Sequence, residues 1–251
     1  MNADTRQQMI LEQLSRRGEV TIGALSSHLE VSEMTIRRDL NQLAAAGLLI
    51  RTHGGATATV SGSFEPPFAV RARANSEAKR QIAGAVADQI RDGQTIILDG
   101  GTTGLAVARA LVGRAITVCA LNITIAALLA DDATTRVMVP GGVVRTGEHS
   151  LIGSEAEAAF RGYRFDLFVM TASAASVAGF TEWNAEDAAV KRAALAASRR
   201  TIVAIDAAKF GNEAFSRICA LDEVDLVVTD DQLQLDDRSQ LDQAGIELLI
   251  A

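Results

Sequence analysis

The sequence predicts a two-part α/β protein, with an N-terminal winged helix-turn-helix joined to a C-terminal, mostly parallel α/β domain. Three short amphipathic segments with helix-capping residues come first, followed by a Gly-Gly turn between apolar stretches. A stretch that contains Pro66 and Pro67 comes next and is typical of a linker. Seven short apolar runs then alternate with helical stretches. We therefore expect domains at residues 1–60 and 76–251, joined by a linker at residues 61–75.

Composition predicts a globular protein of the cytoplasm without a membrane span. Of the 251 residues, 48% are hydrophobic and 22% are charged, as in ordinary globular domains. No apolar run reaches the ~20 residues that a membrane-spanning helix needs, and the polar N-terminal segment is unlike a signal peptide. Cys119 and Cys219 are expected to be buried core thiols, and the three histidines lack metal-binding spacing. We expect no metal and no cofactor.

Charge is distributed unevenly along the chain. The net charge is −7, but residues 1–61 contain six basic and six acidic side chains, which cancel. The whole negative excess therefore lies beyond residue 61. The N-terminal part is less acidic than the rest without being strongly basic, so its charge permits binding to nucleic acid without demonstrating it.

Three helices and a hairpin are predicted in the N-terminal part. The segment Arg6–Arg16 has apolar residues at helical spacing and ends before a glycine. Thr21 is placed to cap a second short helix, and Ser32 is placed to cap a third. The turn His53–Gly54–Gly55 between two apolar stretches predicts a small β-hairpin, which would be the wing.

The third predicted helix has a polar and basic face. A helix that enters the major groove of DNA needs short polar groups near its N-terminus and basic groups for phosphates and base edges. Two residues of the predicted wing are placed to touch the neighbouring backbone. An ordinary surface helix with a solvated Arg-Arg pair is the alternative. The candidate DNA-binding residues are Ser32, Glu33, Thr35, Arg37, Arg38, Asn41, Arg51 and His53.

The spacing of these residues resembles the DeoR family of bacterial transcriptional regulators. The family signature places an arginine and two apolar residues ahead of the pattern small, Thr, apolar, Arg, polar, Asp, apolar. The matching positions are Arg6, Ile10, Leu14, Ser32, Thr35, Ile36, Arg37, Arg38, Asp39 and Leu40. The wing sequence from Arg51 to Ala56 is also similar to the family's. The resemblance implies a DNA-binding regulator in which Asp39 has a structural role.

The C-terminal part begins with a predicted helix at Ser76–Ile90, after which strands and helices alternate. Continuous apolar runs between helices predict a mostly parallel sheet that is covered on both faces. The predicted strands are Thr95–Leu98, Ile116–Ala120, Arg136–Val139, Leu167–Met170, Ile202–Ile205, Leu226–Val228 and Glu247–Ile250. Helical stretches are predicted at Leu105–Leu111, Thr124–Ala130 and Glu186–Arg199.

A candidate ligand site follows the carboxyl ends of several of these strands, where open α/β folds bind ligands. The first strand runs into the glycines and hydroxyls of residues 99–103 and then into a helix, a setting that favours phosphate. It is neither a Walker loop nor G-x-G-x-x-G, so a plain strand-to-helix turn is the alternative. For Lys191, a solvated helix face is the alternative. The candidate effector-binding residues are Asp99, Gly101, Thr102, Thr103, Asn122, Gly141, Gly142, Arg145, Lys191, Asp206 and Lys209.

The resemblance to the DeoR family continues to about Asp230. In that family the C-terminal domain is similar to ribose-5-phosphate isomerase and senses a phosphorylated sugar or related metabolite. The resemblance therefore implies a homo-oligomeric repressor of carbohydrate-metabolism genes that a phosphorylated sugar releases from double-stranded operator DNA. The chain departs from the family at the segment Thr171–Ala174, at Leu121 and at Asp187, so the effector cannot be inferred from a relative.

Two other functions stay open at this point. One is a sugar-phosphate isomerase-like enzyme with an N-terminal DNA-binding appendage, which would need a carboxylate base. Asp99, Asp187 and Asp206 are available for that role, but none lies in a recognisable isomerase motif, so we do not expect an enzyme. The other is an activator whose ligand pocket is vestigial.

Overall fold

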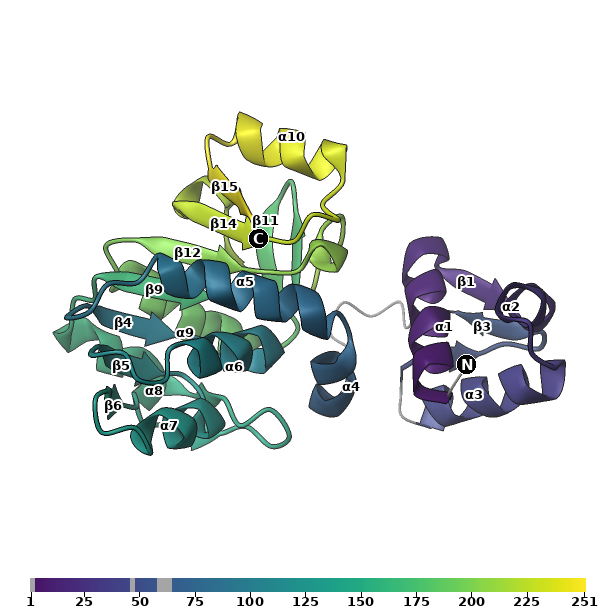
Figure 1. The fold of residues 1–251 in the computed structure, drawn as a ribbon, viewed down its shortest axis with the longest axis horizontal. Helices are drawn as coiled ribbons and strands as arrows, with labels where there is room; N and C mark the ends of the chain where they lie inside the picture. The colour runs from purple at the N-terminus through teal and green to yellow at the C-terminus, as the bar shows by residue number, and fades with distance from the viewer. Residues whose placement is uncertain (1–2, 46–47, 58–64) are drawn as a thin grey trace. The chain divides into compact units, whose positions relative to one another are not determined.

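The computed structural model describes residues 3–45, 48–57 and 65–251. The chain divides into two compact units, Met1–Pro67 and Phe68–Ala251 (Figure 1). The first unit contains helices and a small sheet, and the second contains a large sheet between layers of helices.

The first unit has the predicted winged helix-turn-helix elements. Its helices are α1 (Ala3–Arg17), α2 (Ile22–Leu29) and α3 (Glu33–Ala45). Its strands are β1 (Glu19–Thr21), β2 (Ile50–Arg51) and β3 (Gly55–Thr57). The strands form an antiparallel sheet in the order β1-β3-β2, so the wing hairpin gains a third strand that the sequence pattern did not predict.

Both predicted helix caps in this unit are present. The Thr21 hydroxyl accepts a hydrogen bond of 3.3 Å from the amide of Ala24, and the Ser32 hydroxyl accepts one of 3.2 Å from the amide of Thr35. At the wing, a Cβ on Gly55 would lie only 1.9 Å from the Val20 carbonyl oxygen. Glycine at this position therefore lets β3 pair closely with β1.

The second unit is built on a parallel seven-stranded sheet in the order β15-β14-β12-β9-β4-β5-β6. Its strands are β4 (Thr95–Leu98), β5 (Thr117–Ala120), β6 (Arg136–Met138), β9 (Leu167–Met170), β12 (Thr201–Ala204), β14 (Leu226–Thr229) and β15 (Glu247–Ile250). All seven apolar runs predicted as strands therefore belong to one sheet. The predicted parallel arrangement is confirmed for every adjacent pair.

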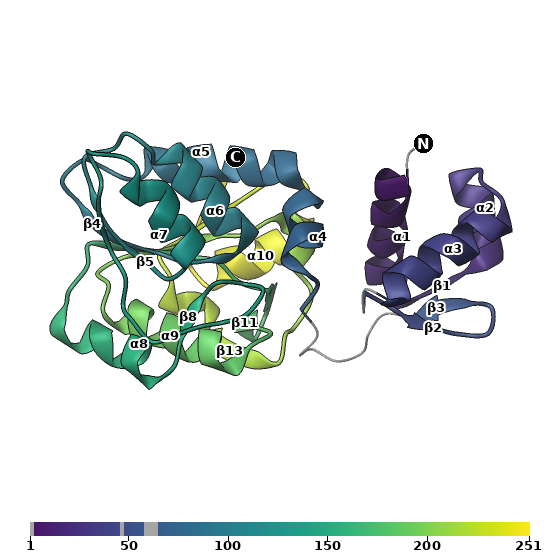
Figure 2. The same ribbon diagram turned by 90° about the horizontal axis from the view of Figure 1, so that it is seen from below.

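Helices cover both faces of this sheet. They are α4 (Phe68–Arg73), α5 (Ser76–Asp88), α6 (Gly101–Ala110), α7 (Ile123–Ala130), α8 (Ser154–Ala159), α9 (Ala185–Ala196) and α10 (Leu235–Gln243). Helices α5, α6 and α7 lie on one face, and α8 and α9 lie on the other (Figure 2). Along β4, Ile96 and Leu98 pack against the first set, whereas Ile97 packs with the second. Burial on both faces explains the continuous apolar runs.

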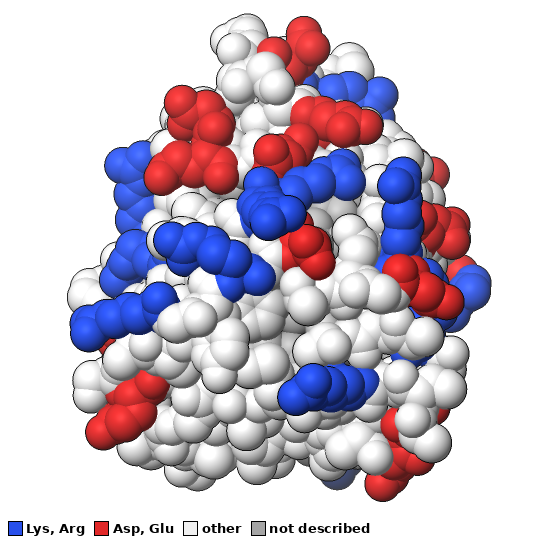
Figure 3. Space-filling view, turned by 90° about the vertical axis from the view of Figure 1, so that its left-hand side faces the viewer, with Lys and Arg blue, Asp and Glu red and all other residues white. Residues whose placement is uncertain are grey.

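Figure 3 shows one face with its charged side chains coloured. Basic and acidic side chains are interspersed over its upper part, and the lower part carries few charges. This face therefore lacks the single-sign patch that would attract the DNA backbone. Among the described residues, every helix is too short or too polar to cross a lipid bilayer.

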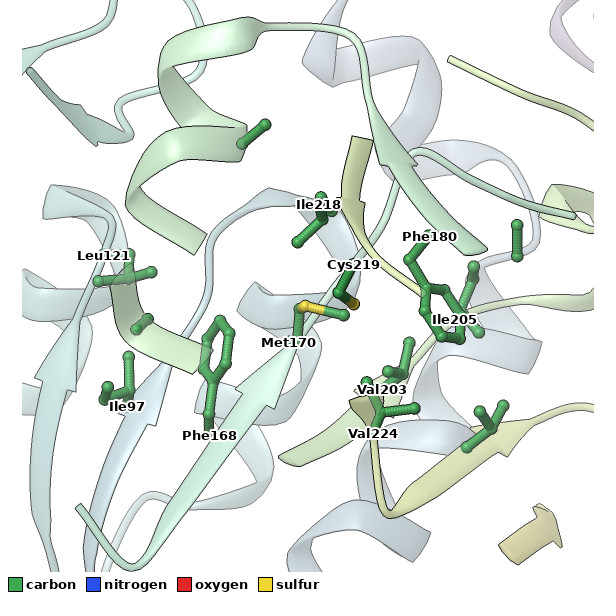
Figure 4. Packing of buried hydrophobic residues seen from close by; sticks show 14 of the residues in the cluster. Ile97, Leu121, Phe168, Met170, Phe180, Val203, Ile205, Ile218, Cys219 and Val224 are labelled. Atoms are coloured by element: carbon green, nitrogen blue, oxygen red, sulfur yellow. The ribbon is translucent and has the colours of Figure 1, made fainter. Parts of the chain in front are cut away.

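The core on the α8–α9 side of the sheet contains both large aromatic side chains and a thiol (Figure 4). Phe168 and Met170 of β9 share one cluster with Phe180 and Cys219. Cys119 belongs to the same cluster, and both thiols are buried and unpaired, as predicted. Burial raises the pKa of each thiol to about 12, so both stay protonated and unreactive near neutral pH.

Two small sheets were not predicted. The hairpin β7 (Val143–Val144) with β8 (Leu151–Ile152) follows the third strand of the large sheet. An antiparallel sheet in the order β10-β11-β13 is formed by Ala174–Ser176, Gly179–Glu182 and Ser216–Cys219. These strands have only two to four residues each, so they give little periodic signal.

The stretch predicted as a linker contains a helix. Helix α4 occupies residues 68–73 and directly follows Pro66 and Pro67, and proline is compatible with the start of a helix. Residues 61–64 of the predicted linker and residues 58–60 of the predicted hairpin lie outside the described residues.

Candidate functional site

Asp39 fixes the position of α3 against α1. Its carboxylate accepts hydrogen bonds from Arg6 at both oxygens, 2.5 Å from Nε and 3.1 Å from Nη2, and a third from Gln7. Asp39 is only 2% exposed, and its hydrogen bond raises the pKa of Arg6. The structure thus agrees with a structural role for Asp39, which points inward from the predicted recognition helix.

The opposite face of α3 is exposed. Five of the predicted DNA-binding residues lie on this face: Ser32, Glu33, Arg37, Arg38 and Asn41. Thr35 is half-buried, and its hydroxyl lies 2.9 Å from that of Ser32 at the start of the helix. Met34 is 74% exposed beside them and was not predicted. An exposed apolar side chain in a polar recognition face is suited to contact a thymine methyl group.

The wing and the recognition helix are joined by Arg51. Its Nε atom donates a 3.1 Å hydrogen bond to the Asn41 side chain, and its guanidinium also donates to the Gly55 carbonyl. Two residues predicted to contact DNA therefore contact each other. His53 is exposed at the tip of the wing. The structure brings α3 and the wing together as one surface, as the winged fold requires.

The second candidate site lies at the carboxyl edge of the large sheet. Asp99, Asn122, Thr171 and Asp206 come just after the neighbouring strands β4, β5, β9 and β12, and all four are buried. Three of the four were predicted from their places after the strands. Thr171 was noted only as a departure from the family pattern.

Lys191 lies at the centre of this edge. Its ammonium lies 3.0 Å from Asp99 Oδ2, 2.5 Å from Glu182 Oε2 and 3.0 Å from the Thr171 carbonyl oxygen. Burial alone would lower the pKa of Lys191, but the Asp99 and Glu182 carboxylates outweigh it and raise the pKa above its ordinary value. The ammonium has only three hydrogens, and these partners account for them. The side chain is buried in the core of the site and is not part of a solvated helix face.

Asp99 organises the turn into α6. One carboxylate oxygen accepts from the Gly100 amide at 2.7 Å, and the other accepts from the Thr171 amide and hydroxyl at 2.9 Å each. Gly101 has φ +72°, and a Cβ on Gly104 would lie 2.2 Å from the Asp99 carbonyl oxygen. Glycine is therefore needed at both positions. The N-terminus of α6 has no side-chain cap, so its amides can bind an anion.

Thr102 and Thr103 are in the first turn of α6. Thr102 is half-buried and Thr103 is buried. Asn122 starts α7: its side-chain oxygen accepts from the amides of Thr124 and Ile125, and its amide donates to the Glu148 carbonyl at 2.8 Å. The Asn122 side chain therefore connects the start of α7 to the β7–β8 hairpin.

The β7–β8 hairpin brings a cation to the site. Arg145 donates to the Asp187 carboxylate at 2.5 Å, and burial raises the pKa of Asp187 although neighbouring cations oppose the change. Gly142 has φ +92°, and a Cβ there would lie 2.5 Å from the Ile152 carbonyl oxygen, so glycine shapes the start of the hairpin. Gly141 is exposed and has φ +85°.

Three residues that were not predicted, Arg71, Lys79 and Trp183, join the predicted Lys209 at this edge. The amine of Lys209, in the short helix η2 (Ala207–Lys209), lies 4.8 Å from the centroid of the Trp183 ring. The guanidinium carbon of Arg71 in α4 lies 5.6 Å from the same centroid. Lys79 of α5 is buried, and burial lowers its pKa to about 8, with Asp206 opposing the change and Lys209 adding to it.

The spacing of apolar residues in the sequence could have indicated that Lys79 is buried. It lies three residues before Ile82 and seven before Val86, on the face of α5 that packs against the sheet. A lysine on an apolar helix face indicates a buried charge with partners. Nothing comparable singles out Arg71 or Trp183, because only the tertiary fold brings them to this edge.

The site thus combines five basic side chains with several carboxylates. Arg71, Arg145 and Lys209 can donate to an anionic group such as phosphate. Lys79 and Lys191 add positive charge, but their ammonium groups already donate to neighbouring oxygens. Asp206 and the neighbouring carboxylates can accept hydrogen bonds from hydroxyl groups. The arrangement therefore fits a small phosphorylated molecule with hydroxyl groups.

A separate hollow lies between β13 and α10. Its volume is about 560 Å³, and its lining includes Arg217, Leu221 and Gln240. None of the predicted effector-binding residues lines it. The chemistry described above therefore belongs to the carboxyl edge of the sheet and not to this hollow.

Each of the two units matches the model of a known protein family. The model of a DeoR-like helix-turn-helix domain matches residues 6–61, and that of a DeoR C terminal sensor domain matches residues 74–231. The chain belongs to the DeoR family. This DeoR-family protein is therefore a DNA-binding transcriptional regulator and not an enzyme.

Two relatives resemble the DeoR-family protein over nearly its full length. The HTH-type transcriptional regulator GlpR of Haloferax volcanii is 31% identical over 97% of this chain and 96% of its own. The glycerol-3-phosphate regulon repressor of Escherichia coli is 34% identical over 92% of each chain. Among solved structures, ribose 5-phosphate isomerase A from Methanocaldococcus jannaschii matches 55% of each chain at 12% identity and a TM-score of 0.42. This structural likeness is too weak to support a functional argument.

The structural role of the buried Lys191 can be tested by measuring protein stability. Lys191→Met is expected to lower the free energy of unfolding by about 3–5 kcal/mol, because it leaves the buried Asp99 and Glu182 carboxylates without their cation. Urea-induced unfolding followed by circular dichroism measures the change. The control is Arg192→Met at the exposed neighbouring position, which is expected to cost under about 1 kcal/mol. A loss for Lys191→Met no larger than the control's would contradict this role.

Proposed function

We propose that the protein is a repressor that binds double-stranded operator DNA through α3 and the wing. The observation that supports this most strongly is the exposed polar and basic face of α3, which Asp39 and Arg51 hold in place from its two sides. The Escherichia coli relative is itself named a repressor. The proposed DNA-binding residues are Ser32, Glu33, Thr35, Arg37, Arg38, Asn41, Arg51 and His53, with Met34 added.

We propose that the effector is a phosphorylated sugar or a related metabolite, bound at the carboxyl edge of the sheet. The gathering of basic side chains around the uncapped N-terminus of α6 supports this. In this proposal Lys209 and Arg145 hold the phosphate, while Lys191 and Asn122 position the residues around it. The other proposed effector-binding residues are Asp99, Gly101, Thr102, Thr103, Gly141, Gly142 and Asp206.

The effector can release DNA only if it favours a state that binds DNA poorly. The proposed DNA-binding domain, residues 1–60, falls in the first unit, and the proposed effector domain, residues 76–251, falls in the second. We propose that the protein acts in the cytoplasm as a homo-oligomer, because a symmetric assembly would match repeated half-sites in an operator. The regulated genes would be those of carbohydrate metabolism.

The proposed base-reading face is tested by Arg37. Arg37→Ala is expected to weaken operator binding by ~1–3 kcal/mol if the guanidinium contacts a base. Gel-shift titrations on a DNA fragment selected by the unaltered protein measure this. Arg91→Ala removes an exposed arginine of the second unit and is expected to leave the affinity unchanged. Equal affinities of Arg37→Ala and Arg91→Ala would remove Arg37 from the interface.

The proposed effector site is tested by Lys209. Lys209→Ala is expected to bind the operator normally but to need more sugar phosphate for release, because a cation near the phosphate is lost. The sugar phosphate that most raises the melting temperature of the unaltered protein is used in the gel shift. The control is Arg136→Ala, since Arg136 starts β6 at the amino-terminal edge of the sheet. Normal release in Lys209→Ala would count against this site.

A further inference from the structure

Helix α4 is the first element of the second unit, and the chain that enters it comes from the first unit. It is held at the carboxyl edge of the large sheet by one contact of its own, one from the turn that follows it and one from α5. Three side chains make these contacts: Arg71, Asn75 and Lys79. Arg71 contacts the β7–β8 hairpin, Asn75 contacts the residue that follows β12, and Lys79 contacts the backbone at the end of α4.

Arg71 pairs with Glu148 of the β7–β8 hairpin. Each of the two side chains is only 12% exposed, so the pair is largely shielded from water. The guanidinium also lies close to α6: a Cβ on Gly101 would be 4.0 Å from Arg71 Nη1. Arg71 therefore reaches the first turn of α6 while its charge is balanced by Glu148.

The turn after α4 is attached to the neighbouring strand end. Asn75 has φ +52° and donates a 2.8 Å hydrogen bond from Nδ2 to Asp206 Oδ1. Lys79 closes the C-terminus of α4, because its amine donates to the carbonyls of Arg71 at 2.5 Å and Ala74 at 2.7 Å. Arg71 and the turn after it are thus held by Glu148, Asp206 and Lys79.

We propose that α4 responds to occupancy of the effector site, because the phosphate group of the effector takes Arg71 from Glu148. This inference rests on the proposed function, since it uses the same site. A phosphate carries about 1.5–2 negative charges near neutral pH and offers three strong acceptor oxygens. It competes with a single carboxylate for the guanidinium and repels that carboxylate. When Arg71 leaves Glu148, α4 loses its attachment to the β7–β8 hairpin.

The consequence is a physical link between the effector and the chain that leads to the DNA-binding unit. An effector must act on an element that has two arrangements if it is to change binding elsewhere. In α4 the two arrangements are Arg71 paired with Glu148 and Arg71 paired with phosphate. Coupling of this kind typically changes an affinity 5–150-fold.

The test uses inorganic phosphate as the probe and the fluorescence of Trp183, the one tryptophan of the chain, as the readout. Glu148→Gln keeps the shape of the side chain but removes the competing charge, so it is expected to tighten phosphate binding at least fivefold. In the Arg71→Met background the same change is expected to tighten phosphate binding clearly less, because only the direct repulsion between phosphate and the Glu148 carboxylate is then relieved. The difference between the two backgrounds is the coupling energy of a double-mutant cycle. Glu77→Gln, which removes an exposed carboxylate paired with Arg80 on α5, is the matched control and is expected to change nothing.

A second measurement uses the unaltered protein. Phosphate is expected to speed amide hydrogen exchange in residues 68–74, because α4 loses its attachment to the hairpin. Phosphate binding with unchanged or slower exchange there, or equal phosphate affinity of Glu148→Gln and Glu77→Gln, overturns the inference and leaves the effector site standing. If phosphate and a panel of sugar phosphates all fail to bind the unaltered protein, the proposed effector site falls and this inference falls with it.

Discussion

The ammonium group of Lys191 holds together the part of the molecule on which the proposed sensing depends. It joins the end of β4 through Asp99, the end of β9 through the Thr171 carbonyl, and β11 through Glu182. A buried cation with two carboxylates is costly to desolvate, so its geometry must be well satisfied. Asp99 in turn shapes the Gly100–Gly101 turn that opens α6. The buried network around Lys191 therefore fixes the positions of the groups around it. Its own members already bond to one another.

The DNA-binding unit follows the same physical plan on a smaller scale. The buried pair of Arg6 and Asp39 sets α3 against α1, and the hydrogen bond of Arg51 to Asn41 sets the wing against α3. The proposed DNA-binding residues can then be exposed on a rigid support. This accounts for Asp39 in the family pattern, since its side chain is buried against Arg6 of α1. Most of the negative excess of the chain lies in the second unit, where basic and acidic side chains form ion pairs such as Arg71–Glu148 and Arg145–Asp187.

The large sheet could be predicted from the sequence because each of its strands is a continuous apolar run, and the rule that ligands bind after such strands located Asp99, Asn122 and Asp206. The helix caps Thr21 and Ser32 were equally visible, since each acts on its own neighbours. The sheet of β10, β11 and β13 was not predictable, because its strands are short and come together from distant positions. Arg71 and Trp183 were missed for the same reason. The spacing of Lys79 from Ile82 contained a usable signal.

In the proposed mechanism, effector and operator bind to opposing states of one protein. Calorimetric titration with the stabilising sugar phosphate, carried out with the free protein and with the protein bound to its operator, tests this claim most directly. Linkage requires that DNA weakens effector binding by the same factor by which the effector weakens DNA binding. The free protein is expected to bind the effector more tightly than the operator-bound protein, by that factor. Equal effector affinity in the presence and absence of operator would contradict it.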